Sequence, residues 1–322
     1  MPLVTSNYSV PLWFFNHHLE TILPGLFRKV NGIKYERERI TTPDNDFLDL
    51  DWCRNGNTHL IIICHGLEGS SNRPYMMGMA KIFAQNGYDA LSWNFRGCSG
   101  EPNLTERAYH SGATDDLQVV IDSAIDKGYK SISLIGFSLG GNIVLKYIGE
   151  KGTAINSSIK SGVALSVPLH LHSSCLEINK PNNILYAKRF LRNLKNKVVE
   201  KSKLLPDKIT LNGINDIKTI IDFDDHYTAP IHGFKNAIDY YEKCSSLYFL
   251  NEISIPTLII NAQNDSFLSE KCYPIKIAES HSHVHLEIPK KGGHCGFPGK
   301  DKNGYLWSEK RALEFIENKT NK

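Results

Sequence analysis

The sequence predicts an α/β fold in which an eight-stranded, mostly parallel sheet is flanked by helices. Short runs of β-branched and apolar residues alternate with longer stretches of helical spacing, a pattern typical of parallel strands joined by helices. The chain has 322 residues, of which 41% are hydrophobic, enough to form a large core. The alternation is interrupted once, by an interval of about eighty residues that is too long for an ordinary connection.

The first two predicted strands are separated by the turn sequence TPDN at residues 42–45, so they should pair as a hairpin. Later strands are joined by crossovers long enough for a helix. The long interval, residues 168–250, is expected to be a helical lid inserted between strands six and seven of a core built from residues 1–167 and 251–322. We call residues 168–250 the insertion. The eight strands are predicted at residues 34–40, 47–52, 60–64, 89–94, 131–136, 162–167, 257–261 and 284–288.

Charge, cysteine content and the length of apolar runs limit the partners and the compartment that the sequence predicts. The 37 basic and 34 acidic residues leave a net charge of +3, too small to suggest a nucleic-acid partner. Seven scattered cysteines without a C-x-x-C pair are typical of a reduced chain, so we expect a cytoplasmic protein. No apolar run approaches the ~18 residues of a membrane span. Residues 2–27 are interrupted by polar side chains and should pack onto the body; a membrane-surface anchor is the less favoured alternative.

The sharpest motif is G-x-S-x-G, formed by Gly136, Ser138 and Gly140. It follows an apolar strand-like run and precedes residues with helical spacing. This context favours a nucleophile elbow, in which a strained turn between strand and helix projects the serine above the sheet. The sequence therefore predicts Ser138 as a nucleophile, with an ordinary structural turn as the alternative.

A serine nucleophile needs a histidine base and a carboxylate that orients the base. Asp265 directly follows the predicted strand 257–261, whereas residues 168–174, the rival position for the acid, contain no carboxylate. The alternative is that the Asp265 carboxylate only accepts a hydrogen bond from a backbone amide of the turn. Among thirteen histidines, His294 lies in a glycine-containing loop after the last predicted strand, which can return over Ser138. The predicted triad is Ser138, Asp265 and His294.

The oxyanion of the intermediate requires backbone donors. The N–H of Leu139, directly after the nucleophile, supplies one, and the N–H of Leu67, in the loop HGLEG at residues 65–69, is expected to supply the other. His65 should only shape this loop. Three alternating histidines at 281, 283 and 285 could suggest a metal site, but without a nearby carboxylate a solvated strand edge is favoured. We expect no metal and no cofactor.

With these features in place, the chain resembles the α/β-hydrolases and, within them, the YheT-like esterase family. The resemblance implies the α/β-hydrolase fold and hydrolysis of short- to medium-chain carboxylic esters by Ser138, Asp265 and His294, with relatives that act on lipids or transfer acyl groups to alcohols. Asp265 is followed by Ser266, where most members of the family have Pro or Asp, but the carboxylate is kept. The stretches that carry the resemblance are PLWFFNHHLETILP at 11–24, HGLEGSSNRPY at 65–75, WNFRGCSGEPN at 93–103, HSGATDDL at 110–117, GFSLGGNIVLKYIGE at 136–150, FDDHYTAPIHGF at 223–234 and GGHCGF at 292–297.

Further features leave alternatives open. His110 and Asp115 have an H-x-x-x-x-D spacing that the wider family associates with acyl transfer, but a bracing role at the following helix is favoured. Arg96 should be a structural loop residue. Residues 184–203 combine apolar side chains with seven cations against Glu200. They could meet anionic lipid surfaces or phosphorylated acyl donors, although a solvated face over a covered pocket is favoured.

The predicted function is therefore that of a serine esterase acting on a small-molecule or lipid ester. An acyltransferase, in which an alcohol replaces water, is the alternative enzyme, because it uses the same catalytic residues. A non-catalytic binding scaffold on the same fold is a third interpretation, which the intact triad argues against.

Overall fold

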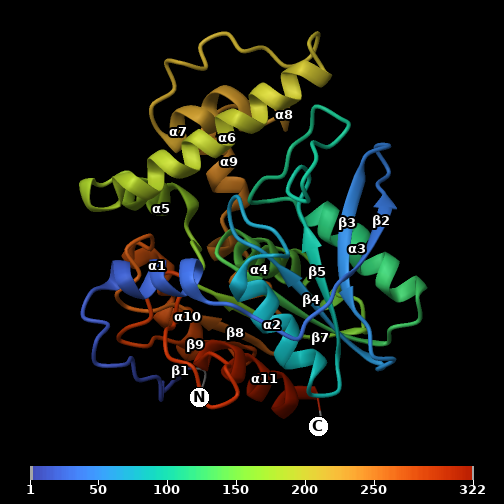
Figure 1. Ribbon diagram of the computed structural model, residues 1–322, viewed down its shortest axis with the longest axis vertical. Coiled ribbons are helices and arrows are strands. Elements are labelled where there is room, and N and C mark those ends of the chain that lie inside the picture. The colour runs from blue at the N-terminus through green and yellow to red at the C-terminus, as the bar shows by residue number, and fades with distance from the viewer. Residues whose placement is uncertain (1–2, 321–322) are drawn as a thin grey trace.

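The computed structural model describes residues 3–320 and has a central nine-stranded sheet in the order β1-β9-β8-β7-β6-β4-β5-β3-β2 (Figure 1). All neighbouring strands are parallel except for β2 with β3 and β3 with β5, which are antiparallel. The strands are β1 (Leu3–Val4), β2 (Glu36–Thr41), β3 (Phe47–Cys53), β4 (His59–Cys64), β5 (Asp89–Asn94), β6 (Ser131–Phe137), β7 (Ile159–Leu165), β8 (Thr257–Ile260) and β9 (Val284–Glu287).

The sheet confirms the predicted hairpin and the mostly parallel arrangement, but it has nine strands where eight were expected. The additional strand, β1, pairs with the edge strand β9, with Leu3 opposite Leu286. Two residues are too few to produce a recognisable alternation, so this strand depends on a tertiary contact. Lys34, expected in the first strand, precedes β2, which begins at Glu36.

Helices cover both faces of the sheet because successive strand residues point to opposite sides. In β4, Leu60 and Ile62 pack in the cluster that contains residues of α3 and α4, whereas Ile61 and Ile63 pack with α2 and α11. The helices outside the insertion are α1 (His17–Phe27), α2 (Pro74–Ala84), α3 (Thr114–Asp126), α4 (Leu139–Lys151), α10 (Ile275–Ser280) and α11 (Trp307–Thr320). Within residues 3–320, no helix is both long and apolar enough to cross a bilayer.

The insertion between β7 and β8 consists mainly of helices, which lie together at the top of the view in Figure 1. Its longest helix, α6, places Leu191 and Val198 in a small apolar cluster with Phe223 and Tyr227, apart from the two clusters of the sheet. The helices are α5 (Leu171–Ile178), α6 (Ile184–Leu204), α7 (Ile220–Phe223), the π-helix Asp224–Thr228, α8 (Ala229–Ile231) and α9 (Ala237–Cys244).

Candidate active site

The predicted site residues follow four strands of the parallel part of the sheet. The HGLEG loop follows β4, Ser138 follows β6, Asp265 lies after β8, and His294 lies after β9. Because these strands and β7 run in the same direction, their carboxyl ends meet at one edge of the sheet. Such an edge is where ligand sites form in open α/β sheets.

Ser138 occupies a strained turn between β6 and α4. Its φ of +53° lies in the left-handed region, which residues other than glycine rarely adopt. A Cβ at Gly136 would lie 2.3 Å from the carbonyl oxygen of Gly140, and one at Gly140 would lie 2.4 Å from that of His65. Both positions of the motif therefore require glycine, because the clashing atoms belong to the backbone.

The three predicted triad residues lie in hydrogen-bonding contact. His294 Nε2 is 3.0 Å from Ser138 Oγ, and His294 Nδ1 is 2.8 Å from Asp265 Oδ2. The buried Asp265 carboxylate also accepts a hydrogen bond from the Phe267 N–H at 3.0 Å. The Phe267 ring packs against the imidazole, with centroids 4.3 Å apart. The acid, the base and the hydroxyl are thus held in line.

The carboxylate determines the protonation of the imidazole. Burial disfavours the charged form of His294, but its interactions with Asp265 and, to a smaller extent, with Cys295 outweigh this effect and raise the pKa of His294 well above its usual value. In the neutral imidazole, the Nδ1–H donates to Asp265, so Nε2 is left as the acceptor for the Ser138 hydroxyl. This tautomer is the one that can remove a proton from the serine.

Two backbone donors adjoin Ser138. Within residues 3–320, neither the Leu67 N–H nor the Leu139 N–H donates to a protein acceptor. A Cβ on Gly66, which precedes Leu67, would lie 3.1 Å from the Ser138 Cβ, so the loop passes directly beside the serine. His65 holds this loop, since its ring nitrogens bond to the Gly66 carbonyl and the Phe95 N–H. Burial lowers the pKa of His65 to about 3, so it stays neutral.

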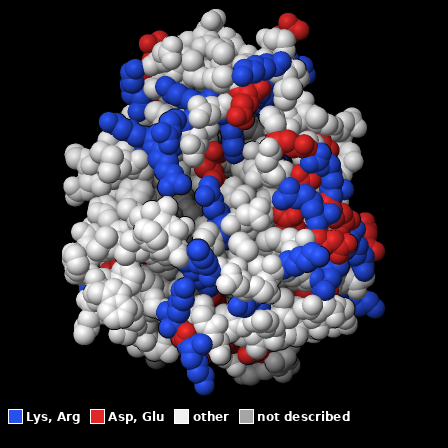
Figure 2. Space-filling model, in the orientation of Figure 1, with Lys and Arg blue, Asp and Glu red and all other residues white. Residues whose placement is uncertain are grey.

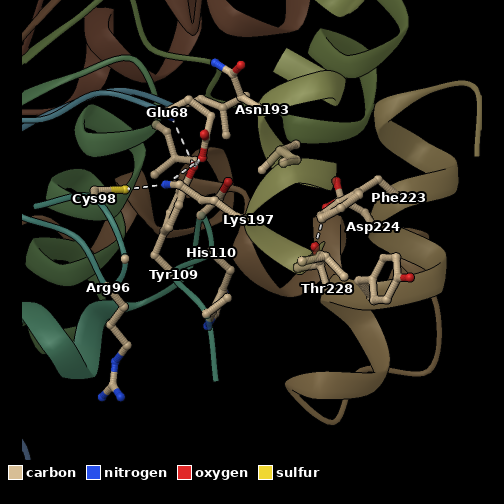
Figure 3. A pocket seen from close by; sticks show the side chains of 18 of the residues that line it. Glu68, Arg96, Cys98, Tyr109, His110, Asn193, Lys197, Phe223, Asp224 and Thr228 are labelled. Carbon is tan, nitrogen blue, oxygen red and sulfur yellow. Dashed lines mark hydrogen bonds and ion pairs between the residues drawn. The ribbon is translucent and has the colours of Figure 1, made fainter. Parts of the chain in front are cut away.

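The loop after Leu67 is joined to the insertion by an ion pair (Figure 3). Glu68 has a φ of +54°, and its carboxylate accepts a hydrogen bond from the Tyr109 hydroxyl at 2.6 Å. Lys197 of α6 lies 2.9 Å from the same oxygen and also donates to the Cys98 sulfur. Burial disfavours the Lys197 ammonium, but Cys98 and Glu68 raise its pKa. The main helix of the insertion therefore contacts the loop that carries Leu67.

These contacts correct the interpretation of residues 184–203 as one solvated basic face. Lys197 points into the molecule, and so does Lys201, whose ammonium donates to the carbonyl oxygens of Glu106 and Arg107. Burial lowers the pKa of Lys201 to about 8. Lys188 and Arg192, in contrast, are exposed. The cations of α6 are divided between the pocket and the surface.

Sequence reasoning missed the part that α1 takes in the site. Thr21 accepts a hydrogen bond from the His294 N–H at 2.9 Å, and the buried Glu20 accepts one from the Gly292 N–H at 2.7 Å. Glu20 also accepts a hydrogen bond from Asn264, next to Asp265. Helix α1 thus holds the histidine loop. The available signal was Glu20, the one acidic residue of a largely apolar stretch that other polar residues also interrupt.

Two cavities meet at Ser138. The larger, of about 440 Å³, is lined by Ser138, Leu139 and many apolar side chains of the insertion, including Leu194 and Phe223. The smaller, of about 250 Å³, lies between α1 and α6 and is lined by Ser138 and His294. Leu67 borders both cavities. An ester held at Ser138 has space on either side of its carbonyl carbon.

The remaining candidate residues have structural partners. His110 is buried beside His232, with ring centroids 4.4 Å apart, whereas Asp115 forms an ion pair with Arg107, so the H-x-x-x-x-D residues take different partners. Arg96 is buried and forms ion pairs with Asp44, Asp46 and Asp116. No group of three or more His, Cys, Asp or Glu residues suited to a metal ion is found in the described chain.

Comparison with known proteins agrees with this geometry. Residues 56–295 match the family described as serine aminopeptidase, S33. The protein YheT of Escherichia coli (strain K12), which carries the name of an esterase, is 34% identical over 94% of this chain and 91% of its own. Phospholipase ABHD3 of Mus musculus is 28% identical over 92% of this chain and 74% of its own. The solved structure of the Pyrococcus furiosus esterase Pf2001 covers 91% of this chain and 96% of its own with a TM-score of 0.60 at 19% identity, which shows a shared fold. The chain therefore belongs to the YheT-like esterase family of the α/β-hydrolases.

Proposed function

We propose that this carboxylic ester hydrolase cleaves medium-chain acyl or lipid esters through an acyl-enzyme formed on Ser138. The observation that carries the proposal is the contact of His294 with both Ser138 Oγ and Asp265, at 3.0 and 2.8 Å. Nucleophile, base and orienting acid in this arrangement are what serine acyl transfer requires. The unpaired N–H groups of Leu67 and Leu139 are the proposed oxyanion donors.

In the first half-reaction, Ser138 Oγ attacks the ester carbonyl carbon while His294 Nε2 takes the hydroxyl proton. The negative charge that develops on the carbonyl oxygen is stabilised by the Leu67 and Leu139 N–H groups. The carbon–oxygen bond to the alcohol then breaks, and His294 returns the proton to the departing alcohol. In the second half-reaction, His294 takes a proton from water, which attacks the acyl carbon. The bond between that carbon and Ser138 Oγ then breaks, His294 returns the proton to Oγ, and the carboxylic acid leaves the regenerated enzyme.

We further propose that residues 168–250 form a lid over a core of residues 1–167 and 251–322, and that the larger cavity takes the acyl chain. The lining of this cavity by apolar residues of the insertion supports the assignment. All seven cysteines are free thiols, which supports a reducing compartment such as the cytoplasm.

The test is kcat/KM for p-nitrophenyl esters of increasing acyl length, with and without ethanol. Each buried methylene should contribute up to about 0.8 kcal/mol, or roughly fourfold, until the cavity is full. We therefore expect a peak at a medium chain length and the free acid as the main product. A peak at acetate would contradict the covered acyl cavity, and ethyl ester as the main product would favour the acyltransferase alternative.

A pair of variants on α6 localises the acyl site. Leu194 lines the larger cavity, whereas Val199, on the same helix, lines neither cavity. Leu194→Trp should shift the preferred ester to a shorter chain because it fills space, and Val199→Trp should leave the preference unchanged. An equal effect of both substitutions, or none of either, would argue against the larger cavity as the acyl site.

A further inference from the structure

The segment that precedes and forms α1 exposes an unusual number of large apolar side chains. Leu12 is 97% exposed, Trp13 72%, Phe15 79% and Phe27 73%. They lie at both ends of α1, and Ile22 between them is 37% exposed. Single apolar residues on a surface are ordinary, but large exposed apolar areas usually mark an interaction site. We call Leu12, Trp13, Phe15, Leu26 and Phe27 the apolar ridge.

The apolar ridge borders the entrance to the site. On its inner side, α1 holds the His294 loop through Glu20 and Thr21. Helix α1 contacts the start of α6, where His18 Nδ1 lies 3.1 Å from the Tyr186 hydroxyl. The smaller cavity lies between these helices and is lined by both Leu26 and Arg189. A surface bound to the apolar ridge would therefore lie beside a cavity that reaches Ser138.

The start of α6 adds positive charge next to the apolar ridge. Lys188, Arg189 and Arg192 are exposed and, within residues 3–320, form no ion pair with an acidic side chain within 4 Å. Leu185, on the same turn, is 79% exposed. In Figure 2, a band of Lys and Arg side chains runs down from the insertion across the middle of the molecule, beside surface that carries little charge. Unpaired cations beside exposed aromatic rings complement an anionic, partly apolar surface.

We propose that the apolar ridge and the three cations dock the enzyme on an anionic lipid bilayer. Aromatic rings partition into the interface between lipid headgroups and acyl chains, and basic side chains are attracted to anionic headgroups. Docking presents the smaller cavity to the bilayer, so a lipid ester can reach Ser138 from the membrane. Because binding is measured without turnover, its outcome is separate from that of the catalytic proposal.

The test is sedimentation with vesicles of phosphatidylglycerol and phosphatidylcholine, and with vesicles of phosphatidylcholine alone. The unaltered protein should bind the anionic vesicles at low salt and bind the neutral ones much less. Lys188→Gln with Arg192→Gln should weaken binding roughly thirtyfold, about fivefold for each basic residue. The charge-matched control is Lys130→Gln with Lys160→Gln, two exposed lysines at the amino-terminal ends of β6 and β7, the edge of the sheet opposite Ser138, and it should bind as the unaltered protein does.

The aromatic side chains provide an independent measurement. Trp13→Ser with Phe15→Ser should weaken binding at least tenfold at every salt concentration, because it removes apolar contact rather than charge. Binding should also shift the tryptophan emission of the unaltered protein to the blue, and Trp13→Phe should reduce that shift. Absence of binding to anionic vesicles at low salt would overturn the proposal. Equal binding by all variants, or self-association through the apolar ridge in sedimentation-velocity experiments, would overturn it as well.

Discussion

Substitution of Gly140 by alanine tests whether the turn at Ser138 controls the chemistry. The new Cβ would lie 2.4 Å from the His65 carbonyl oxygen and 2.5 Å from that of Cys64. Relief to ordinary van der Waals contact requires a relative movement of about 1 Å between α4 and the end of β4, because neither obstacle is a flexible side chain. Such a movement displaces Ser138 from His294 and from the Leu67 N–H, and a misplacement of about 1 Å can cost roughly 100-fold in rate.

The measurement is kcat/KM on a short p-nitrophenyl ester, made well below the melting temperature of each variant. Gly141→Ala is the control, since its Cβ would meet mainly the movable Val167 side chain, at 2.6 Å. It should destabilise the protein by roughly 1–3 kcal/mol while reducing the rate much less than Gly140→Ala does. Activity of Gly140→Ala within threefold of the unaltered enzyme would refute the reasoning, because the serine would then not depend on this turn.

Three further predictions concern the His294 base, the loop that carries Leu67 and the buried ion pairs of Arg96. Asp265 raises the pKa of His294, and the reaction needs the neutral imidazole, so activity should fall as the pH drops through that pKa. Asp265→Asn should move this acid limb of the kcat/KM profile to lower pH and reduce the plateau by roughly 10⁴-fold through loss of the tautomer; an unchanged limb would contradict the assignment. Lys197→Met removes the ion pair with Glu68, in the loop that carries Leu67, and should lower kcat more than it changes KM. The loss should be smaller than the roughly 100-fold cost of losing an oxyanion donor, because Glu68 keeps its hydrogen bond from the Tyr109 hydroxyl; a change in KM alone would contradict this. Arg96→Met leaves buried carboxylates uncompensated, at a cost of roughly 3–5 kcal/mol, so calorimetry should show a melting temperature about 4–7 °C lower, and an unchanged value would argue against a stabilising network.

The fold was largely predictable because its central strands are short apolar runs, such as HLIIIC in β4, separated by stretches of helical spacing, and both patterns can be recognised without tertiary information. The contact of Ser138, Asp265 and His294 could be predicted because residues that follow parallel strands meet at one edge of the sheet. Strand β1 could not be predicted, because its two residues are ordered by pairing with β9. Glu20 and Thr21 were missed because their contacts with the His294 loop join segments more than 270 positions apart.

The cations of α6 show a different limit. The seven basic residues were assigned to one face because of their number, although their spacing distinguishes buried from exposed positions. Lys197 and Lys201 lie three and seven positions after Leu194, on the same helical stripe as Val198, so their inward orientation follows from the helical period. The sequence did not reveal which partners make a buried lysine tolerable. Glu68 and the carbonyl oxygens of residues 106 and 107 come from distant loops.

Labelling with a fluorophosphonate probe tests the central claim most directly, because only a base-activated serine reacts quickly with it. Mass spectrometry should locate one adduct on the intact protein, at Ser138, and Ser138→Ala should abolish it. His294→Ala should slow labelling by several orders of magnitude while leaving the serine in place. Rapid labelling of Ser138→Ala, or failure of the intact protein to label, would contradict the assignment of Ser138 as the nucleophile.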